Sequence, residues 1–149
     1  MRRQRPLIAA SLVAALSAAA FAHSGATGIV KERMDGMDTL AKAMKSLAGM
    51  SKTGDIDSDQ VVAIAQTIKA HSGQAMTERF PEGSLPHVSE ATPKIWEDWA
   101  RFEAISGELF DAAARLEAEA KVPDLDLKVY MKELGATCSS CHEDFRIKK

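Results

Sequence analysis

Close to the C-terminus the chain reads Cys138-Ser139-Ser140-Cys141-His142. Two cysteines separated by two residues and followed directly by histidine form the attachment signature of a c-type haem. On a helix this spacing places the two sulfurs one turn apart, which suits the two vinyl groups on one edge of a porphyrin. The adjacent histidine can then bind the iron through an imidazole nitrogen. The chain contains 2 cysteines, so covalent attachment of one haem c, with its iron, would consume both thiols.

Other interpretations of the cysteine pair explain less. A thioredoxin-like pair would follow a strand early in a βαβ unit, and no strand-like alternation precedes this one. A zinc site needs a second pair of ligands, but His23, His71 and His87 are not paired at ligand spacing. A disulfide between Cys138 and Cys141 is open in an oxidising compartment, although it leaves the adjacent histidine unexplained.

The N-terminus predicts export from the cytoplasm. Basic residues precede an almost unbroken apolar run over residues 7–21, and a small-x-small site, Ala20-Phe21-Ala22, closes it. These are the parts of a secretory signal peptide. The run is short for a membrane span, which needs about 20 apolar residues, and an uncleaved anchor is the alternative. We therefore expect residues 1–22 to be a cleaved signal and the mature protein to lie in a bacterial periplasm, without stable membrane insertion.

The charge of the mature chain excludes some partners. Taking the three signal arginines from the 19 basic residues leaves 16 against 21 acidic residues, a formal charge of −5 for residues 23–149. Nucleic-acid-binding domains present a basic face, so we expect none of that activity from this single domain. No acid/base pair or nucleophile elbow is visible. The expected function is that of an electron carrier, not an enzyme, meeting small redox proteins or membrane electron-transfer complexes.

Hydrophobic periodicity predicts an all-α fold of four helices. They are expected at residues 27–50, from Asp57 or Ser58 to about Gly73, from Pro93, capped by Thr92, to Pro123, and from Asp124 or Asp126 through the haem motif. Residues 81–92 hold too many prolines and glycines for regular structure and allow the chain to cross the bundle.

The first predicted helix has a distinct apolar stripe. Its members recur at alternating four- and three-residue steps, the spacing of a core-facing seam: Val30, Met34, Met37, Ala41, Met44 and Ala48. Leu40 and Leu47 widen this stripe. Thr27 is expected to cap this helix.

The order of these features resembles the class II cytochromes c, the cytochrome c′ family. The resemblance covers essentially the whole mature chain. Its specific marks are the haem motif on the last helix, the pair Phe145-Arg146 after the histidine, and Arg33 followed four residues later by Met37. In the family, the residue at that last position lies on the distal side of the haem. The resemblance implies an antiparallel four-helix bundle with the haem on the C-terminal helix.

The residue at the distal position separates two functions. In the family it is often Leu or Phe, which leaves the iron open to small gases. Here it is Met37, whose thioether can bind iron opposite His142, as in the low-spin, electron-transferring branch. Met34, one turn earlier, is the second candidate for this ligand. Methionine is also an ordinary core residue, so the alternative function is binding of nitric oxide or carbon monoxide at a five-coordinate iron. A helical metal-storage or interaction module without haem is a third hypothesis.

Two arginines complete the expected haem site. By resemblance Arg33 pairs with a haem propionate, and the alternative is an arginine on the surface. Arg146, one turn after His142, is expected either to cap the last carbonyls of its helix or to shield a propionate. Many members of the family are homodimers, but the outer positions of the first helix are polar, which favours a monomer.

Overall fold

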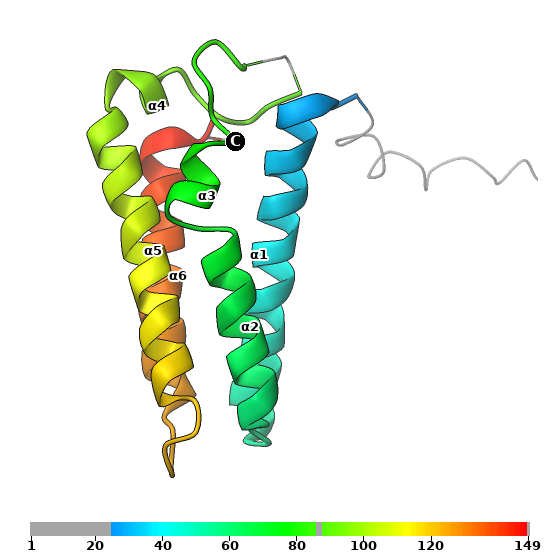
Figure 1. Cartoon of the computed structure of the whole chain (residues 1–149), viewed down its shortest axis with the longest axis vertical. Coiled ribbons are helices and arrows are strands. Elements are labelled where there is room, and N and C mark those ends of the chain that lie inside the picture. Colours follow the sequence, from blue (N-terminus) through cyan, green and yellow to red (C-terminus); the bar gives the residue numbers. More distant parts are fainter. Residues whose placement is uncertain (1–24, 86–87, 149) are drawn as a thin grey trace, which may run out of the picture.

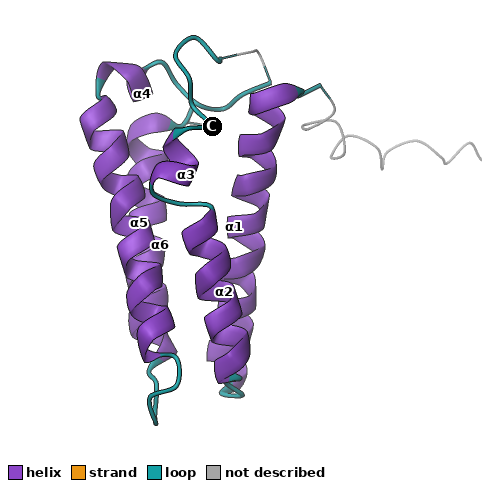
Figure 2. Cartoon of the chain, viewed as in Figure 1, coloured by secondary structure: helices purple, strands orange, loops and turns teal. Residues whose placement is uncertain are grey.

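The computed structural model describes residues 25–148 except residues 86 and 87, and it is an antiparallel four-helix bundle (Figures 1 and 2). The helices are α1 (Gly28–Thr53), α2 (Ser58–Ala70), α3 (Gln74–Thr77), α4 (Lys94–Glu97), α5 (Trp99–Glu119) and α6 (Leu127–Phe145). Within the described residues the only β-type pairing is an isolated antiparallel bridge between Ala91 and Arg146. The predicted all-α bundle is confirmed.

The predicted signal, residues 1–22, lies outside the described residues. Over the part of the chain that is described, no helix is both long enough and apolar enough to cross a membrane.

The long helices close into a ring in which each packs against the next. Contacts join α1 to α2, α2 to α5, α5 to α6, and α6 back to α1. Because successive long helices alternate in direction, the beginning of α1 and the end of α6 lie at the same end of the bundle (Figure 1). This arrangement brings the Arg33 and Met37 segment of the first helix to the end that carries the haem motif.

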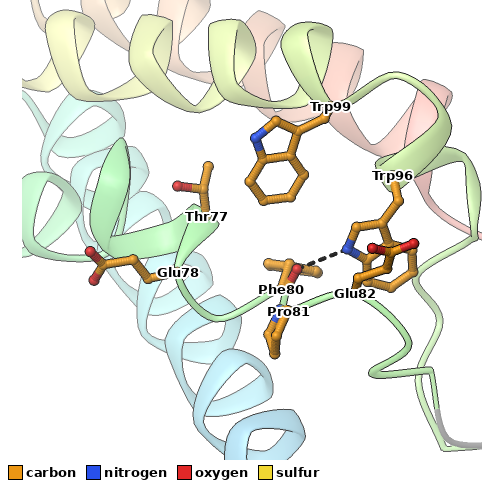
Figure 3. Close-up of a pocket in the computed structure, with 7 residues that line it drawn as sticks. All are labelled: Thr77, Glu78, Phe80, Pro81, Glu82, Trp96 and Trp99. Carbon is orange, nitrogen blue, oxygen red and sulfur yellow. Dashed lines mark hydrogen bonds between the residues drawn. The ribbon is translucent and has the colours of Figure 1, made fainter.

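An aromatic cluster fills the core at that end. The Phe102 side chain is 1% exposed, and its ring centroid lies 4.9 Å from that of Phe80, 5.6 Å from that of Trp99 and 5.5 Å from that of Phe145. The indole N–H of Trp96 donates to the Phe80 carbonyl at 2.9 Å (Figure 3). These contacts fasten α4 and the end of α6 to the turn that follows α3.

Two of the expected helix starts have the predicted caps. The Asp57 carboxylate accepts hydrogen bonds from the backbone N–H groups of Asp59 and Gln60 at 3.0 and 3.1 Å, and Asp126 accepts one from Lys128 at 3.1 Å. Such caps satisfy N–H groups that have no partner inside the helix. Thr27 is the N-cap residue of α1, as predicted, with an extended backbone, but its side chain forms no capping hydrogen bond.

The buried stripe of α1 lies one position away from the predicted seam. Ala41 and Ala48 are exposed, and Met34, Met37 and Met44 are only partly buried. The buried residues are Val30, Arg33, Gly36, Leu40, Ala43, Leu47 and Met50. They follow one another at steps of three or four residues, so the predicted period is confirmed, and Leu40 and Leu47 are buried as predicted. The centre of the stripe differs from the prediction because an arginine and a glycine belong to it.

The third predicted helix is divided in two. Backbone angles of φ −131° and ψ 57° at Asp98 interrupt it between α4 and α5. The short helix α4 has contacts of its own. Ile95 is 1% exposed, and the Trp96 indole N–H donates to the Phe80 carbonyl. Thr92 does not cap this helix; its N–H and hydroxyl groups both donate to the Phe145 carbonyl, at 2.9 and 3.1 Å.

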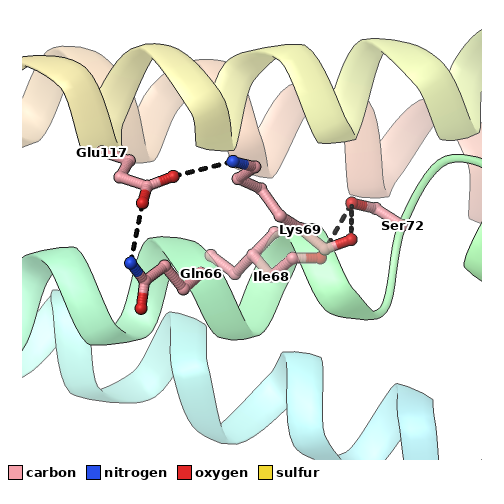
Figure 4. Close-up of polar contacts among 5 residues, drawn as sticks. All are labelled: Gln66, Ile68, Lys69, Ser72 and Glu117. Atoms are coloured by element: carbon pink, nitrogen blue, oxygen red, sulfur yellow. Dashed lines mark hydrogen bonds and ion pairs between the residues drawn. The ribbon is translucent and has the colours of Figure 1, made fainter.

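A polar contact joins the second half of α2 to the last turn of α5 (Figure 4). The Glu117 carboxylate accepts hydrogen bonds from Lys69 and Gln66, both at 2.8 Å. The hydrogen bond from Lys69 comes first among the causes that hold the pKa of Glu117 below its ordinary 4.5, and the bond from Gln66 comes second. The ionised carboxylate is therefore favoured by the fold.

Replacing Glu117 with glutamine should make the protein less sensitive to acid. A carboxylate whose pKa is lowered on folding contributes stability above its ordinary pKa of 4.5, and that contribution is lost as the pH falls through the lowered value. Urea unfolding at neutral pH and at about pH 4 should show a smaller acid loss of unfolding free energy in Glu117→Gln than in the wild type. Glu103→Gln, on the exposed side of α5, is the matched control. Equal acid losses in the wild type and Glu117→Gln would contradict the prediction.

Candidate functional site

The two thiols of the haem motif lie on one face of α6. Cys138 and Cys141 are three residues apart in a continuous helix, so their side chains are neighbours one turn apart. Both are partly buried against the hydrophobic core, and both are free thiols, not a disulfide. The geometry presents two sulfurs side by side where the helix meets the interior of the bundle.

The surroundings of these two thiols disfavour their ionised, thiolate form. Burial raises the pKa of Cys138, and burial, followed by the nearby Cys138 and Asp144, raises the pKa of Cys141 to about 11. Redox-active pairs of the thioredoxin type have a lowered cysteine pKa, so this environment does not favour that interpretation. Among the described residues no group of three or more His, Cys, Asp or Glu side chains is placed to hold a metal ion.

His142 follows the second thiol near the end of α6. His142 is exposed as a residue, but partial desolvation of its ring, and then the positive charge of Arg146, lower the pKa of His142 below the ordinary 6.5. A neutral imidazole is the form that binds iron, so the fold favours that form at neutral pH. The turn around it is held to its neighbours, because Asp144 forms ion pairs with Lys94 at 3.8 Å and with Arg101 at 3.5 Å.

Arg33 is buried in the structure, so the surface alternative is wrong. Its side chain is 4% exposed. The guanidinium donates to the Ser84 hydroxyl at 3.0 Å, to the Ser84 carbonyl, and to the Ser89 hydroxyl at 2.9 Å. It also lies 4.8 Å from the centroid of the Phe80 ring. No carboxylate among the described residues forms an ion pair with it, and a buried cation without a counter-charge favours the approach of an anion.

Of the four methionines of α1, Met50 belongs to the buried stripe, and the other three lie beside it. Met37 and Met44 are partly buried and pack against the edge of the core, and Met34 is partly buried as well. Met37 lies one helical turn after Arg33, at the end of the bundle that holds the haem motif. It is thus near the core surface without being needed to fill the core.

Arg146 directs its side chain away from the helix axis. Its Nε donates to Glu90 at 2.7 Å, and a second guanidinium nitrogen pairs with the same carboxylate oxygen. The cap on α6 is instead the Arg146 backbone N–H, which donates to the His142 carbonyl at 3.2 Å. The side chain therefore links α6 to the connection between α3 and α4.

A cavity of about 490 Å³ opens at the same end of the bundle (Figure 3). Three aromatic and two acidic side chains are among its walls, which come from α3, the following turn, α4 and the start of α5: Thr77, Glu78, Phe80, Pro81, Glu82, Trp96 and Trp99. The haem-motif thiols do not line it. The cavity therefore lies beside the candidate haem site, with Phe80 also contacting Arg33.

Some residues of this end were not predicted from the sequence. Ser84, Ser89 and Glu90 hold the two arginines, although nothing in their local sequence singles them out. The signal that could have found them is the connection itself, since an irregular segment near two buried or half-buried arginines must supply hydrogen-bond acceptors.

Comparison with known proteins identifies the family. A sequence model of cytochrome c′ matches residues 28–146. The chain belongs to the cytochrome c′ family. It is 36% identical to cytochrome c-556 of Agrobacterium tumefaciens strain B2A over 123 residues, which cover 82% of this chain and 99% of that protein. It is 33% identical to cytochrome c′ of Cereibacter sphaeroides over 155 residues, covering 97% and 99% of the two chains.

Solved cytochromes c′ share the fold. A variant of the Rhodopseudomonas palustris protein has a TM-score of 0.73 at 29% identity, covering 83% of this chain and all of that one. A nitric oxide complex of an Alcaligenes xylosoxidans variant has a TM-score of 0.71 at 28% identity, covering 81% and 94% of the two chains.

The residues present fit the haem c that cytochromes c′ carry covalently. Two neighbouring thiols face the bundle interior, and the chain has 2 cysteines in all. The buried Arg33 has no carboxylate partner among the described residues, which suits a group that brings carboxylates of its own. The pKa of His142 is lowered, so its ring is available as a neutral ligand.

A variant that cannot attach haem should be less stable. In Cys138→Ala/Cys141→Ala the thioether links are lost, and with them the apolar plate that the bundle is expected to enclose. We expect a lower and broader thermal unfolding transition than in the matured wild type, with absorbance confirming the loss of covalent haem. Ser139→Ala, an exposed change between the two thiols, should unfold like the wild type. Equal melting temperatures and cooperativity for the double variant would contradict the prediction.

Proposed function

We propose that the protein carries single electrons through a haem c attached at Cys138 and Cys141, with His142 and Met37 as axial ligands of the iron. The observation that supports this proposal is the position of Met37. It lies four residues after the buried Arg33, at the edge of the core and at the end of the bundle that holds the haem motif. The core-facing stripe of α1 is complete without it.

Each residue of the site has a separate task in this proposal. The Cys138 and Cys141 thiols add to the two vinyl groups and tie the haem to α6. His142 supplies its lone pair as a neutral imidazole. Arg33 offers its buried positive charge to a propionate while Ser84 and Ser89 keep the guanidinium in place.

Ligation by one methionine and one histidine suits electron transfer. When bound, the haem supplies a reversible one-electron couple, and a Met/His ligand pair raises its potential. Two protein ligands that stay in place in both oxidation states keep the rearrangement around each transfer small. In this proposal the packing of α1 and α6 against each other holds those ligands.

The second candidate function is binding of nitric oxide or carbon monoxide at an iron whose distal side is open. It is favoured by the nitric oxide complexes of the Alcaligenes xylosoxidans cytochrome c′ variants, which are 28% identical to this chain. Among the comparisons these complexes name a ligand directly, whereas the cytochrome c-556 relatives support a carrier by name alone. In this case Met37 would only pack over the distal face.

The location and partners belong to the same proposal. The N-terminal sequence supports export to the periplasm, where small redox proteins or membrane electron-transfer complexes would exchange electrons with the haem. The polar outer positions of α1, including the exposed ion pairs of Lys31 with Asp35 and Lys42 with Asp38, support a monomer.

Replacing Met37 with alanine separates the two functions. If Met37 binds the iron, the reduced wild type should be low-spin and insensitive to carbon monoxide, because both axial positions are occupied. Met37→Ala should then become high-spin and bind carbon monoxide at least about tenfold more tightly. Visible absorbance spectra with and without carbon monoxide provide the measurement.

Two neighbouring methionines serve as matched controls. Met34→Ala and Met44→Ala change partly buried methionines of the same helix and should leave the wild-type spectrum unchanged. A high-spin wild type that binds carbon monoxide, with a spectrum unaltered in Met37→Ala, would refute the ligand role and favour gas binding. A low-spin spectrum lost only in Met34→Ala would assign the ligand to Met34.

A further inference from the structure

A four-residue segment, Ser89–Thr92, contacts both helices that carry the candidate axial ligands. It ends the connection between α3 and α4, which runs over the end of the bundle where α1 begins and α6 ends (Figure 1). We call this segment the strap. Its residues lie immediately before Pro93 and are partly buried.

On one side the strap binds α1 through the Ser89 hydroxyl. This oxygen accepts a hydrogen bond from the Arg33 guanidinium at 2.9 Å and a second from the backbone N–H of Ala91 at 3.2 Å. A single side-chain oxygen therefore fixes both the buried arginine and the backbone of the strap. Arg33 lies one helical turn before Met37.

On the other side the strap binds the end of α6 through a side-chain ion pair and two backbone hydrogen bonds, which together define an antiparallel bridge. The Glu90 carboxylate pairs with the Arg146 guanidinium, and the Glu90 carbonyl accepts from the Ile147 N–H at 2.8 Å. Ala91 forms the isolated antiparallel bridge with Arg146. The Thr92 N–H donates to the Phe145 carbonyl at 2.9 Å. Arg146 lies one helical turn after His142.

We propose that the strap is a positioning element that couples the distal side of the haem to the proximal side. The contacts form a continuous series from Arg33 to Ser89, along the strap backbone to Ala91, and across the bridge to Arg146. A shift of α1 at Arg33 is thereby transmitted to the last turn of α6, and the reverse. The inference rests on the proposed function in one respect, namely that the haem lies between these two helices.

Burial makes the α1 side of this link firm. Because the Arg33 side chain is 4% exposed, loss of an acceptor cannot be made good by bulk water at no cost. The α6 side uses the backbone hydrogen bonds of the antiparallel bridge. These bonds fix the direction of the strap as well as its distance from the end of α6. A flexible surface loop would lack both the buried contact to α1 and the backbone hydrogen bonds to α6. Its movement would not link the two helices.

A double-mutant cycle tests the coupling. Ser89→Ala removes the Arg33 acceptor, and Arg146→Gln removes the guanidinium on the α6 side. The dissociation constant for carbon monoxide is measured in the reduced, matured Met37→Ala protein, whose iron is open under either proposed function, alone and with Ser89→Ala, with Arg146→Gln and with both. If the strap couples the two sides, the effects should depart from multiplicativity by at least about threefold.

Ser84 provides the matched control for this cycle. Its hydroxyl accepts from the same guanidinium at 3.0 Å, but Ser84 precedes the strap, and its side chain bonds only to Arg33 and to the Pro81 carbonyl among the described residues. The cycle of Ser84→Ala with Arg146→Gln should be multiplicative. Ser89→Thr, which keeps a hydroxyl, should restore the coupling and shows that folding is intact.

The outcomes of the test are distinct. Multiplicative effects in the Ser89 cycle, or the same departure in the Ser84 cycle, would overturn the proposal. Amide hydrogen exchange adds a readout that does not depend on ligand binding: the Thr92 and Ile147 amides should exchange faster in Ser89→Ala than in Ser84→Ala, and equal rates would also count against the strap. Failure of the Met37 ligand hypothesis appears separately, as an unchanged spectrum in Met37→Ala, because the cycle is measured in the Met37→Ala background, where the iron is open in either case.

Discussion

The hydrogen bonding of the buried Arg33 guanidinium is the interaction on which the haem end of the bundle depends. A cation that is 4% exposed must find acceptors inside the protein, and Ser84 and Ser89 supply them from a segment with no regular structure. Helix packing fixes α1, α2, α5 and α6 along their lengths, but it does not hold the polypeptide that covers their ends. The hydrogen bonds that Arg33 donates hold this segment over the end of the bundle, and they bring the strap to α6.

Features that depend on local sequence could be predicted. The caps at Asp57 and Asp126 follow from a short polar side chain placed before an apolar periodic segment, and both form in the structure. The irregular connection at residues 81–92 follows from its prolines and glycines. The haem motif needed only its own residues and their spacing, because the chemistry of attachment is local, and the family then implied the bundle around it.

Features that depend on distant residues could not be predicted. Arg33 meets Ser84 and Ser89 across 51 and 56 positions of the sequence, and Arg146 meets Glu90 across 56. The phase of the α1 stripe has the same origin. Gly36 belongs to it because a side chain there would stand 3.2 Å from the His71 ring, and that ring comes from the segment after α2. A pattern of apolar residues contains no information about such neighbours.

The corrected phase of α1 bears on the role of its methionines. If the methionines were ordinary core residues, they would occupy the stripe that faces the interior, and Met34, Met37 and Met44 would be fully buried. That stripe is instead filled by Gly36, Leu40, Ala43, Leu47 and a fourth methionine, Met50, and the other three methionines lie along its edge. Burial in the core therefore accounts for Met50, whereas Met34, Met37 and Met44 are only partly buried. A thioether at the edge of the core, one turn from a buried cation and at the end that carries the haem motif, supports the proposed ligand role of Met37.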